Sequence, residues 1–146
     1  MHSYSSIHLH VVFATWNRQR FIIPVIRPRL HAYIAATARR LGVRDVEAGG
    51  HDDHVHLLGR FDPAKSHSSV IGQIKQAATH WMREQDLLRF RWQRGFGAFS
   101  VSPDRVAAVA RYIKRQEEHH RRATFHDELE RLLAELGVNI KDVRLL

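Results

Sequence analysis

Several residue types are missing from this chain of 146 residues, and each absence excludes a class of function. It has no cysteine, which excludes disulfide bonds, thiolate catalysis and cysteine-ligated zinc. No apolar run approaches the roughly 18 to 20 residues that a membrane span needs. The first six residues are too polar for a secretory leader. We therefore expect a cytoplasmic protein without a membrane partner.

Common phosphate-binding and hydrolase motifs are missing as well. The sequence contains no Walker loop, no G-x-G-x-x-G, no H-E-x-x-H and no G-x-S-x-G. ATP-driven chemistry and serine hydrolysis therefore have no support in the sequence. Any metal or acid–base chemistry must use carboxylates, amides, hydroxyls or the 12 histidines.

Positive charge predominates in the sequence. The 23 basic residues, mostly arginine, outnumber the 15 acidic ones and give a formal net charge of +8. Such a balance favours a polyanionic partner, and nucleic acid is the most common one. Arginine presents a planar fork to phosphate and a flat face to bases. The hydrophobic share of 44% and the charged share of 26% are those of an ordinary globular domain.

The hydrophobic pattern predicts the order β-α-β-β-α-β followed by two further helices. Alternation predicts strands, and spacing of three and four predicts helices. We expect strands at 7–14, 43–48, 54–61 and within 90–101, and helices at 28–41, 68–85, 103 to about 116, and 124 to 137. This order is typical of an α+β, ferredoxin-like antiparallel sheet with helices on one face, plus C-terminal helices. We expect one domain over 1–146, with a core at about 3–120 and an appended helix at about 124–137.

Two histidine pairs have the spacing of a metal site. Alternate residues of a strand face the same side, about 7 Å apart, so His54 and His56 could bind one divalent ion. His8 and His10 have the same spacing on the first strand. Either pair could be the metal pair, both could line one site, or the histidines could simply cover a solvated face.

A tyrosine and an amide share one face of the third predicted helix. Tyr112 and Gln116 are four residues apart, and His119 and His120 lie on or near that face if the helix continues. Basic residues surround them. The alternative interpretation is an amphipathic helix with a half-buried tyrosine.

Arginine and aromatic side chains also alternate in two segments. Planar cations and rings in this arrangement can hold phosphates and stack on unpaired bases. The alternative is a solvated basic face beside a core aromatic cluster. The two segments contain Trp16, Arg18 and Arg20, and then Phe90, Arg91, Trp92, Arg94 and Phe96.

Taken together, these segments resemble the HUH endonucleases, and more closely the small single-tyrosine transposases of bacterial insertion sequences. This IS200-like family includes the REP-associated tyrosine transposases. The resemblance rests on HLHVVFATWNRQR, GGHDDHVHLLGRF, IGQIKQAATHWM, WQRGFGAFSVSPDRV and YIKRQEEHH, in that order. It covers roughly residues 3 to 120.

The resemblance implies a metal-dependent single-strand DNA endonuclease and strand transferase that acts on hairpin-flanked DNA. Tyr112 would form a 5′-phosphotyrosine, and His54, His56 and Gln116 would hold Mg²⁺ or Mn²⁺. In this family the metal-binding histidines follow the tight turn between two strands. The resemblance therefore favours His54 and His56 over His8 and His10. Tyr112 could be supplied across the subunits of a homodimer. The expected DNA-binding residues are Arg18, Arg20, Lys75, Trp92, Arg94, Arg111, Lys114 and Arg115.

Three alternatives stay open. A non-catalytic single-strand-binding module of ferredoxin-like fold would not need Tyr112 or the histidines. A metal-dependent nuclease that uses water would form no covalent intermediate. A domesticated repeat-hairpin nuclease would keep the chemistry without mobility.

Overall fold

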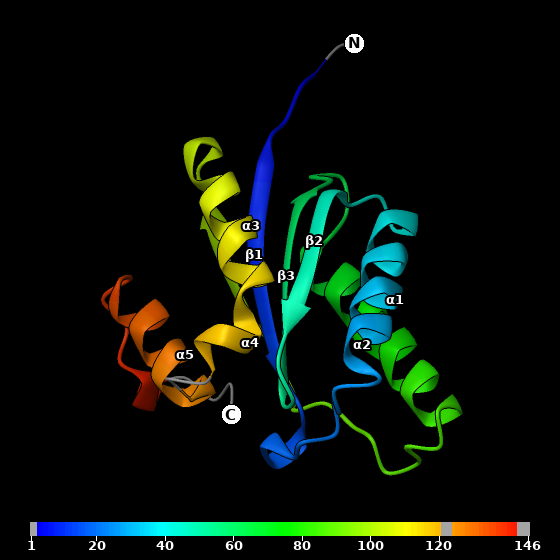
Figure 1. Cartoon of the computed structure of the whole chain (residues 1–146). Helices are drawn as coiled ribbons and strands as arrows, with labels where there is room; N and C mark the ends of the chain where they lie inside the picture. The colour runs from blue at the N-terminus through cyan, green and yellow to red at the C-terminus, as the bar shows by residue number, and fades with distance from the viewer. Residues whose placement is uncertain (1–2, 121–123, 143–146) are drawn as a thin grey trace.

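A computed structural model describes residues 3–120 and 124–142 of the chain (Figure 1). The four strands are β1 (Ile7–Ala14), β2 (Arg44–Gly50), β3 (His54–Phe61) and β4 (Gly97–Val101). The helices are α1 (Arg27–Arg40), α2 (His67–Glu84), α3 (Val106–Lys114), α4 (Gln116–His119) and α5 (Phe125–Ala134). Short 3-10 turns lie at Trp16–Arg18, Pro103–Arg105 and Ile140–Asp142. None of the helices in these ranges is long and apolar enough to span a bilayer.

The sheet has the strand order β2-β3-β1-β4, and every pairing is antiparallel. The two central strands are therefore β1 and β3, and the first strand after each helix lies at an edge. This is the ferredoxin-like arrangement that the order of elements predicts, so the α+β prediction is confirmed. The predicted bounds of β1 and β3 are also correct to the residue.

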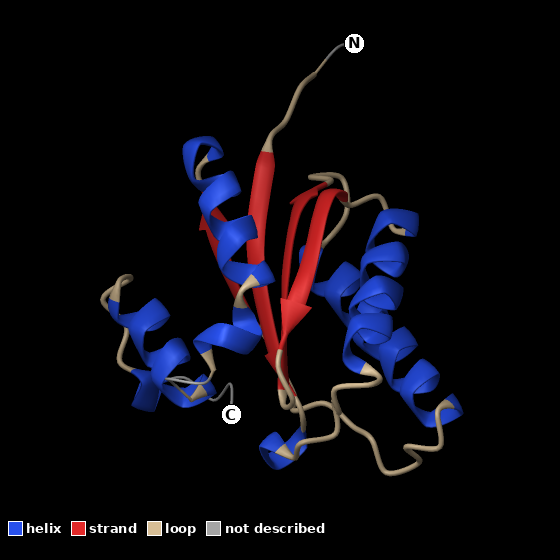
Figure 2. Cartoon of the chain, in the orientation of Figure 1, coloured by secondary structure: helices blue, strands red, loops and turns tan. Residues whose placement is uncertain are grey.

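The two faces of the sheet carry different helices (Figure 2). Val11 and Phe13 point to one face, where they join the main core with α1 and α2. Val12 and Ala14 point to the other face and pack against α5 in a smaller cluster. Strand alternation thus assigns every second residue of β1 and β3 to the layer that contains α3, α4 and α5.

The helix predicted from residue 103 differs from the structure in two ways. The hydroxyl of Ser102 makes no capping hydrogen bond, and Pro103–Arg105 forms a 3-10 turn before α3 begins at Val106. The helix also ends at Lys114, and after Arg115 a separate turn, α4, begins at Gln116. The appended helix begins as predicted, with a reciprocal capping box between Thr124 and Asp127, but it ends at Ala134 and not at residue 137.

Gly49 determines how closely α3 approaches the sheet. A Cβ atom at this position would contact the carbonyl oxygen of Ile113 and would lie 2.7 Å from its Cγ2 atom. Only glycine therefore allows α3 to lie directly on the end of β2. This contact helps to place Tyr112, which precedes Ile113, and Gln116, three residues after it, over the histidines of β3.

Candidate active site

His54 and His56 lie on the α3–α5 face of the sheet and are fully buried. They pair in register with Ala14 and Val12 of β1, which face the same layer. The Nδ1 atom of His54 lies 2.8 Å from a carboxylate oxygen of Asp53. A proton on Nδ1 that is donated to this carboxylate leaves the Nε2 lone pair available for a cation.

His8 and His10, the alternative histidine pair on β1, lie in different environments. His10 is buried, and its Nε2 atom lies 2.7 Å from Nδ1 of His56. His8 instead has its Nε2 atom 3.8 Å from Asp45, away from this cluster. One member of the rival pair therefore lines the same site from the neighbouring strand, as a support for the outer nitrogen of His56.

Gln116 and Tyr112 join the histidines from above the sheet. The buried Gln116 has its Oε1 atom 3.0 Å from Nε2 of His54. The half-buried Tyr112 has its ring centroid 5.7 Å from that of His56. Four residues selected from the sequence therefore lie together in the structure, although two of them, His54 and Gln116, are 62 positions apart.

Glu128 of α5 is the central residue that the sequence interpretation missed. Its carboxylate is fully buried, and one oxygen, Oε1, lies 2.6 Å from Nε2 of His56 and 3.5 Å from Nε2 of His54. The other oxygen, Oε2, accepts hydrogen bonds from the Tyr112 hydroxyl and from Nε2 of Gln116, the latter at 3.2 Å. The available signal was a carboxylate beside Phe125 and Leu129, on the apolar face of a predicted helix.

His119 and His120 also reach this carboxylate. Their Nε2 atoms lie 3.1 Å and 3.3 Å from Oε2 of Glu128. Burial opposes the charge of Glu128, but hydrogen bonds with His120, His54 and His56 outweigh it and hold the carboxyl pKa well below its usual range. Glu128 is therefore an ionised, buried acid.

The pKa values of the two buried β3 histidines are shifted in opposite directions. At His54 it opposes the charge, but the hydrogen bonds and charges of Asp53 and Glu128 outweigh it and raise the pKa to about 9. At His56 burial dominates and lowers the pKa to about 4. Burial and then the charge of Glu128 raise the pKa of Tyr112 well above its usual 10.0. The phenol therefore keeps its proton until a positive charge enters the site.

The donor atoms fit a divalent cation. His54, His56 and Glu128 each offer one ligand atom, and these atoms all lie within 4.8 Å of one another. Imidazole nitrogens with a carboxylate oxygen suit Mn²⁺ and its neighbours, and Mg²⁺ accepts the oxygen ligands. The buried His/Glu group could thus bind a metal ion, and Gln116 adds an amide oxygen beside it.

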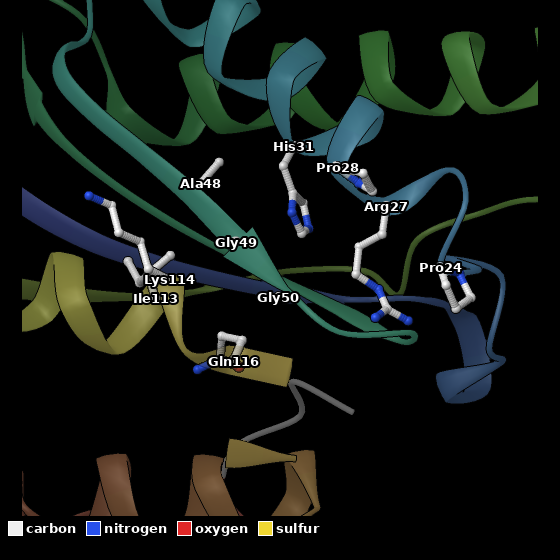
Figure 3. A pocket seen from close by; sticks show the side chains of 10 residues that line it. All are labelled: Pro24, Arg27, Pro28, His31, Ala48, Gly49, Gly50, Ile113, Lys114 and Gln116. Atoms are coloured by element: carbon white, nitrogen blue, oxygen red, sulfur yellow. The ribbon is translucent and has the colours of Figure 1, made fainter. Parts of the chain in front are cut away.

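Two of the cavities that adjoin the site flank α3. The first, of about 340 Å³, lies between β2, α3 and the start of α1 and includes Arg27, His31, Lys114 and Gln116 (Figure 3). The second, of about 250 Å³, reaches Tyr112 and includes Arg105 and Arg131. Each cavity therefore combines a residue of the candidate site with basic side chains, although Arg27, Arg105 and Arg131 were not predicted.

Two of the predicted DNA-binding side chains make contacts within the chain. Trp92 is 8% exposed and lies in the core against Phe13, so its ring is not available to a base. Lys75 donates to the carbonyl oxygens of Gln93 and Gly95, and burial lowers its pKa to about 8. Both side chains thus hold the segment before β4.

The other predicted contacts lie at or near the surface. Arg18 is partly buried, with its guanidinium 5.9 Å from the centroid of Phe125. Its neighbour Arg20 is highly exposed and pairs with Asp52 at 3.5 Å. The remaining exposed positions are Arg94, Arg111, Lys114 and Arg115.

Comparisons with known proteins bear on the family and the fold of this chain. A family model described as transposase IS200-like matches residues 3–116. The transposase for insertion sequence element IS200 of Salmonella typhimurium is 30% identical over 75% of this chain and 76% of its own length, and the Salmonella typhi protein gives the same values. A putative transposase from Deinococcus radiodurans R1 shares the fold with a TM-score of 0.63 at 19% identity, over 80% of this chain and 95% of the other. A REP-associated tyrosine transposase bound to a REP hairpin gives a TM-score of 0.56 at 18% identity, over 82% and 74%. The chain belongs to the IS200-like transposase family.

Proposed function

We propose that this transposase cuts and rejoins single-stranded DNA beside a hairpin, with Tyr112 as the nucleophile. The observation that carries the proposal is the meeting of Tyr112, His54 and His56 around one buried carboxylate within a single chain. A solvated histidine face or a tyrosine at the edge of a core would not require this convergence. The structural relative that is bound to a REP hairpin supports a folded, single-stranded substrate.

The reaction is a transesterification. The Tyr112 oxygen attacks the scissile phosphorus and loses its proton, and the bond from phosphorus to the 3′-oxygen breaks. The products are a 5′-phosphotyrosine and a 3′-hydroxyl that has gained a proton. Rejoining reverses these steps with another 3′-end, so the ester conserves the bond and no ATP is required.

His54, His56 and Gln116 would hold a divalent metal, Mg²⁺ or Mn²⁺. When bound, it supplies a positive charge that polarises the phosphate and stabilises the leaving 3′-oxygen. Asp53 and His10 orient the two imidazoles through their outer nitrogens. Arg131 lies with Nη2 at 3.5 Å from the Tyr112 oxygen, where it can hold the phosphate that Tyr112 attacks.

The DNA strand would run between the two basic cavities. Lys114, Arg27 and His31 line the cavity on the Gln116 side, and Arg105 and Arg131 line that on the Tyr112 side. Phosphate contacts supply most of the affinity of such a surface. The exposed residues that extend it are Arg18, Arg20, Arg94, Arg111 and Arg115.

We propose one domain for the chain, with each site assembled within one subunit. Tyr112 lies beside its own His56, which supports an arrangement in cis over a tyrosine supplied across a dimer. A homodimer stays a prediction, to be measured by sedimentation. A crossed site would require α3 and α4 to leave their contacts with Gly49 and Glu128.

A trapped adduct tests the function. The protein is incubated with labelled oligonucleotides that carry palindromic hairpins and single-stranded flanks, with Mn²⁺ or Mg²⁺, and analysed on a denaturing gel. A covalent, metal-dependent shift that Tyr112→Phe abolishes is the expected result. Cleavage without an adduct would indicate a water-using nuclease, and binding without cleavage would indicate a non-catalytic module.

A further inference from the structure

The appended helix α5 lies beyond the residues that the family model matches, which end at 116, and yet it reaches into the site. We propose that Glu128 of α5 is a metal ligand that also holds Tyr112, so that metal binding, docking of α5 and placement of the nucleophile are linked. This inference rests on the proposed function, because it adds a residue to the same site. It makes the C-terminal helix a working part of the enzyme.

The two oxygens of Glu128 have separate partners. Oε1 faces the Nε2 atoms of His54 and His56, the nitrogens that would bind the cation. Oε2 accepts from the Tyr112 hydroxyl and from Nε2 of Gln116. An ionised carboxylate has lone pairs enough for both sides. One side chain therefore spans the distance between the metal ligands and the nucleophile.

The charge of the site points to the same role. Two imidazoles and an amide are neutral ligands. A divalent cation in a buried site needs an anionic ligand to offset the free-energy cost of losing its hydration shell. Asp53 bonds to the outer nitrogen of His54, away from Nε2. Glu128, fully buried, supplies the negative charge on the inner side.

The position of α5 depends on a small set of contacts. The helix runs from Phe125 to Ala134, which is too short to be stable alone in water. Phe125 stacks on the ring of His54 at 4.3 Å, and Leu129 packs against the β1 side chains of the smaller core cluster. A cation that binds only the docked helix stabilises that docking, and a docked helix raises the affinity for the cation by the same factor.

The test measures Mn²⁺ affinity by calorimetry, and amide hydrogen exchange in α5 with and without Mn²⁺. Glu128→Gln keeps the shape of the side chain and removes its charge. Glu130→Gln, on the exposed side of the same helix, is the matched control. We expect Glu128→Gln to lose at least the roughly 10- to 100-fold in affinity that an outer-shell partner provides. Mn²⁺ should protect α5 in the wild type and in Glu130→Gln, but not in Glu128→Gln.

Three outcomes would overturn the inference. Wild-type affinity for Mn²⁺ in Glu128→Gln would show that Glu128 is not a metal ligand. Faster cleavage by that variant would show that Glu128 inhibits the reaction. Unchanged exchange of α5 on addition of Mn²⁺ to the wild type would break the linkage. If Glu128→Gln fails to fold, Glu128→Asp replaces it, since the shortened acid should weaken Mn²⁺ binding while retaining the charge. Tyr112→Phe separates the two proposals, because it should bind Mn²⁺ normally and yet form no adduct.

Discussion

Replacing Gly49 with alanine should damage the site without touching any of its polar groups. The added methyl would press on the carbonyl oxygen and the Cγ2 atom of Ile113 in α3. The main chain cannot move as easily as the end of a side chain, so α3 must shift away from β2. Overpacking of this kind costs about 1–3 kcal/mol. In a domain of this size, that cost lowers the Tm by roughly 2–12 °C.

The effect on catalysis should exceed the effect on stability. Ile113 follows Tyr112 directly, so a shift of α3 moves the nucleophile relative to His56. A displacement of about 1 Å can reduce a rate by about 10²-fold. We therefore expect Gly49→Ala to remain folded at 20 °C and to form about 100-fold less adduct, measured by single-turnover cleavage together with thermal unfolding.

Gly72→Ala is the matched control for the same chemical change. Gly72 lies inside α2, and a Cβ there would meet nothing within 4 Å. Alanine should stabilise this helix by about 0.4–1 kcal/mol and leave cleavage unchanged. If Gly49→Ala had the wild-type Tm and adduct yield, the close approach of α3 would not control the site and the argument would be refuted.

Further predictions concern the individual groups. Tyr112→Phe should abolish cleavage and the adduct but keep hairpin affinity in a filter-binding assay; an adduct in this variant would contradict the assignment. His54→Ala should lose metal-dependent cleavage, whereas His8→Ala should keep it, and equal losses would point to the wrong pair. Lys114→Gln should weaken binding of single-stranded DNA and reduce the salt dependence of log K by roughly 0.7, and exposed Lys141→Gln is the control that should change neither. Mixing His54→Ala with Tyr112→Phe under subunit exchange should restore no activity, because each site forms within one chain; recovery to half would show that the sites are crossed.

The sheet was predictable because its strands follow a local rule. Alternation in β1 and β3 fixes both their bounds and which residues face each layer. The third helix was less predictable, because Ser102 has the right type for a cap and yet makes no capping bond. Its break at Arg115 brings the buried Gln116 onto His54, and this contact is made between elements far apart in sequence.

The candidate site was predictable only where spacing carries information. The H-x-H pair and the Tyr112–Gln116 spacing can be read within a strand or a helix. Glu128 lies 72 residues from His56, and no short-range pattern connects them. The burial of Trp92 was equally hard to predict, since Arg91 and Arg94 lie near it in sequence, whereas its ring contacts the distant Phe13 in space.

The distance along the chain between His56 and Glu128 also determines when the site can form during synthesis. Once His56 has been translated, 72 further residues must follow before the carboxylate exists. At about 5–20 residues per second, this takes roughly 4–14 s. The ferredoxin-like core can therefore fold on the ribosome well before the tyrosine meets its acidic partner. A nascent chain released early would contain the sheet and the nucleophile without Glu128, so a premature stop codon should separate folding from the completed site.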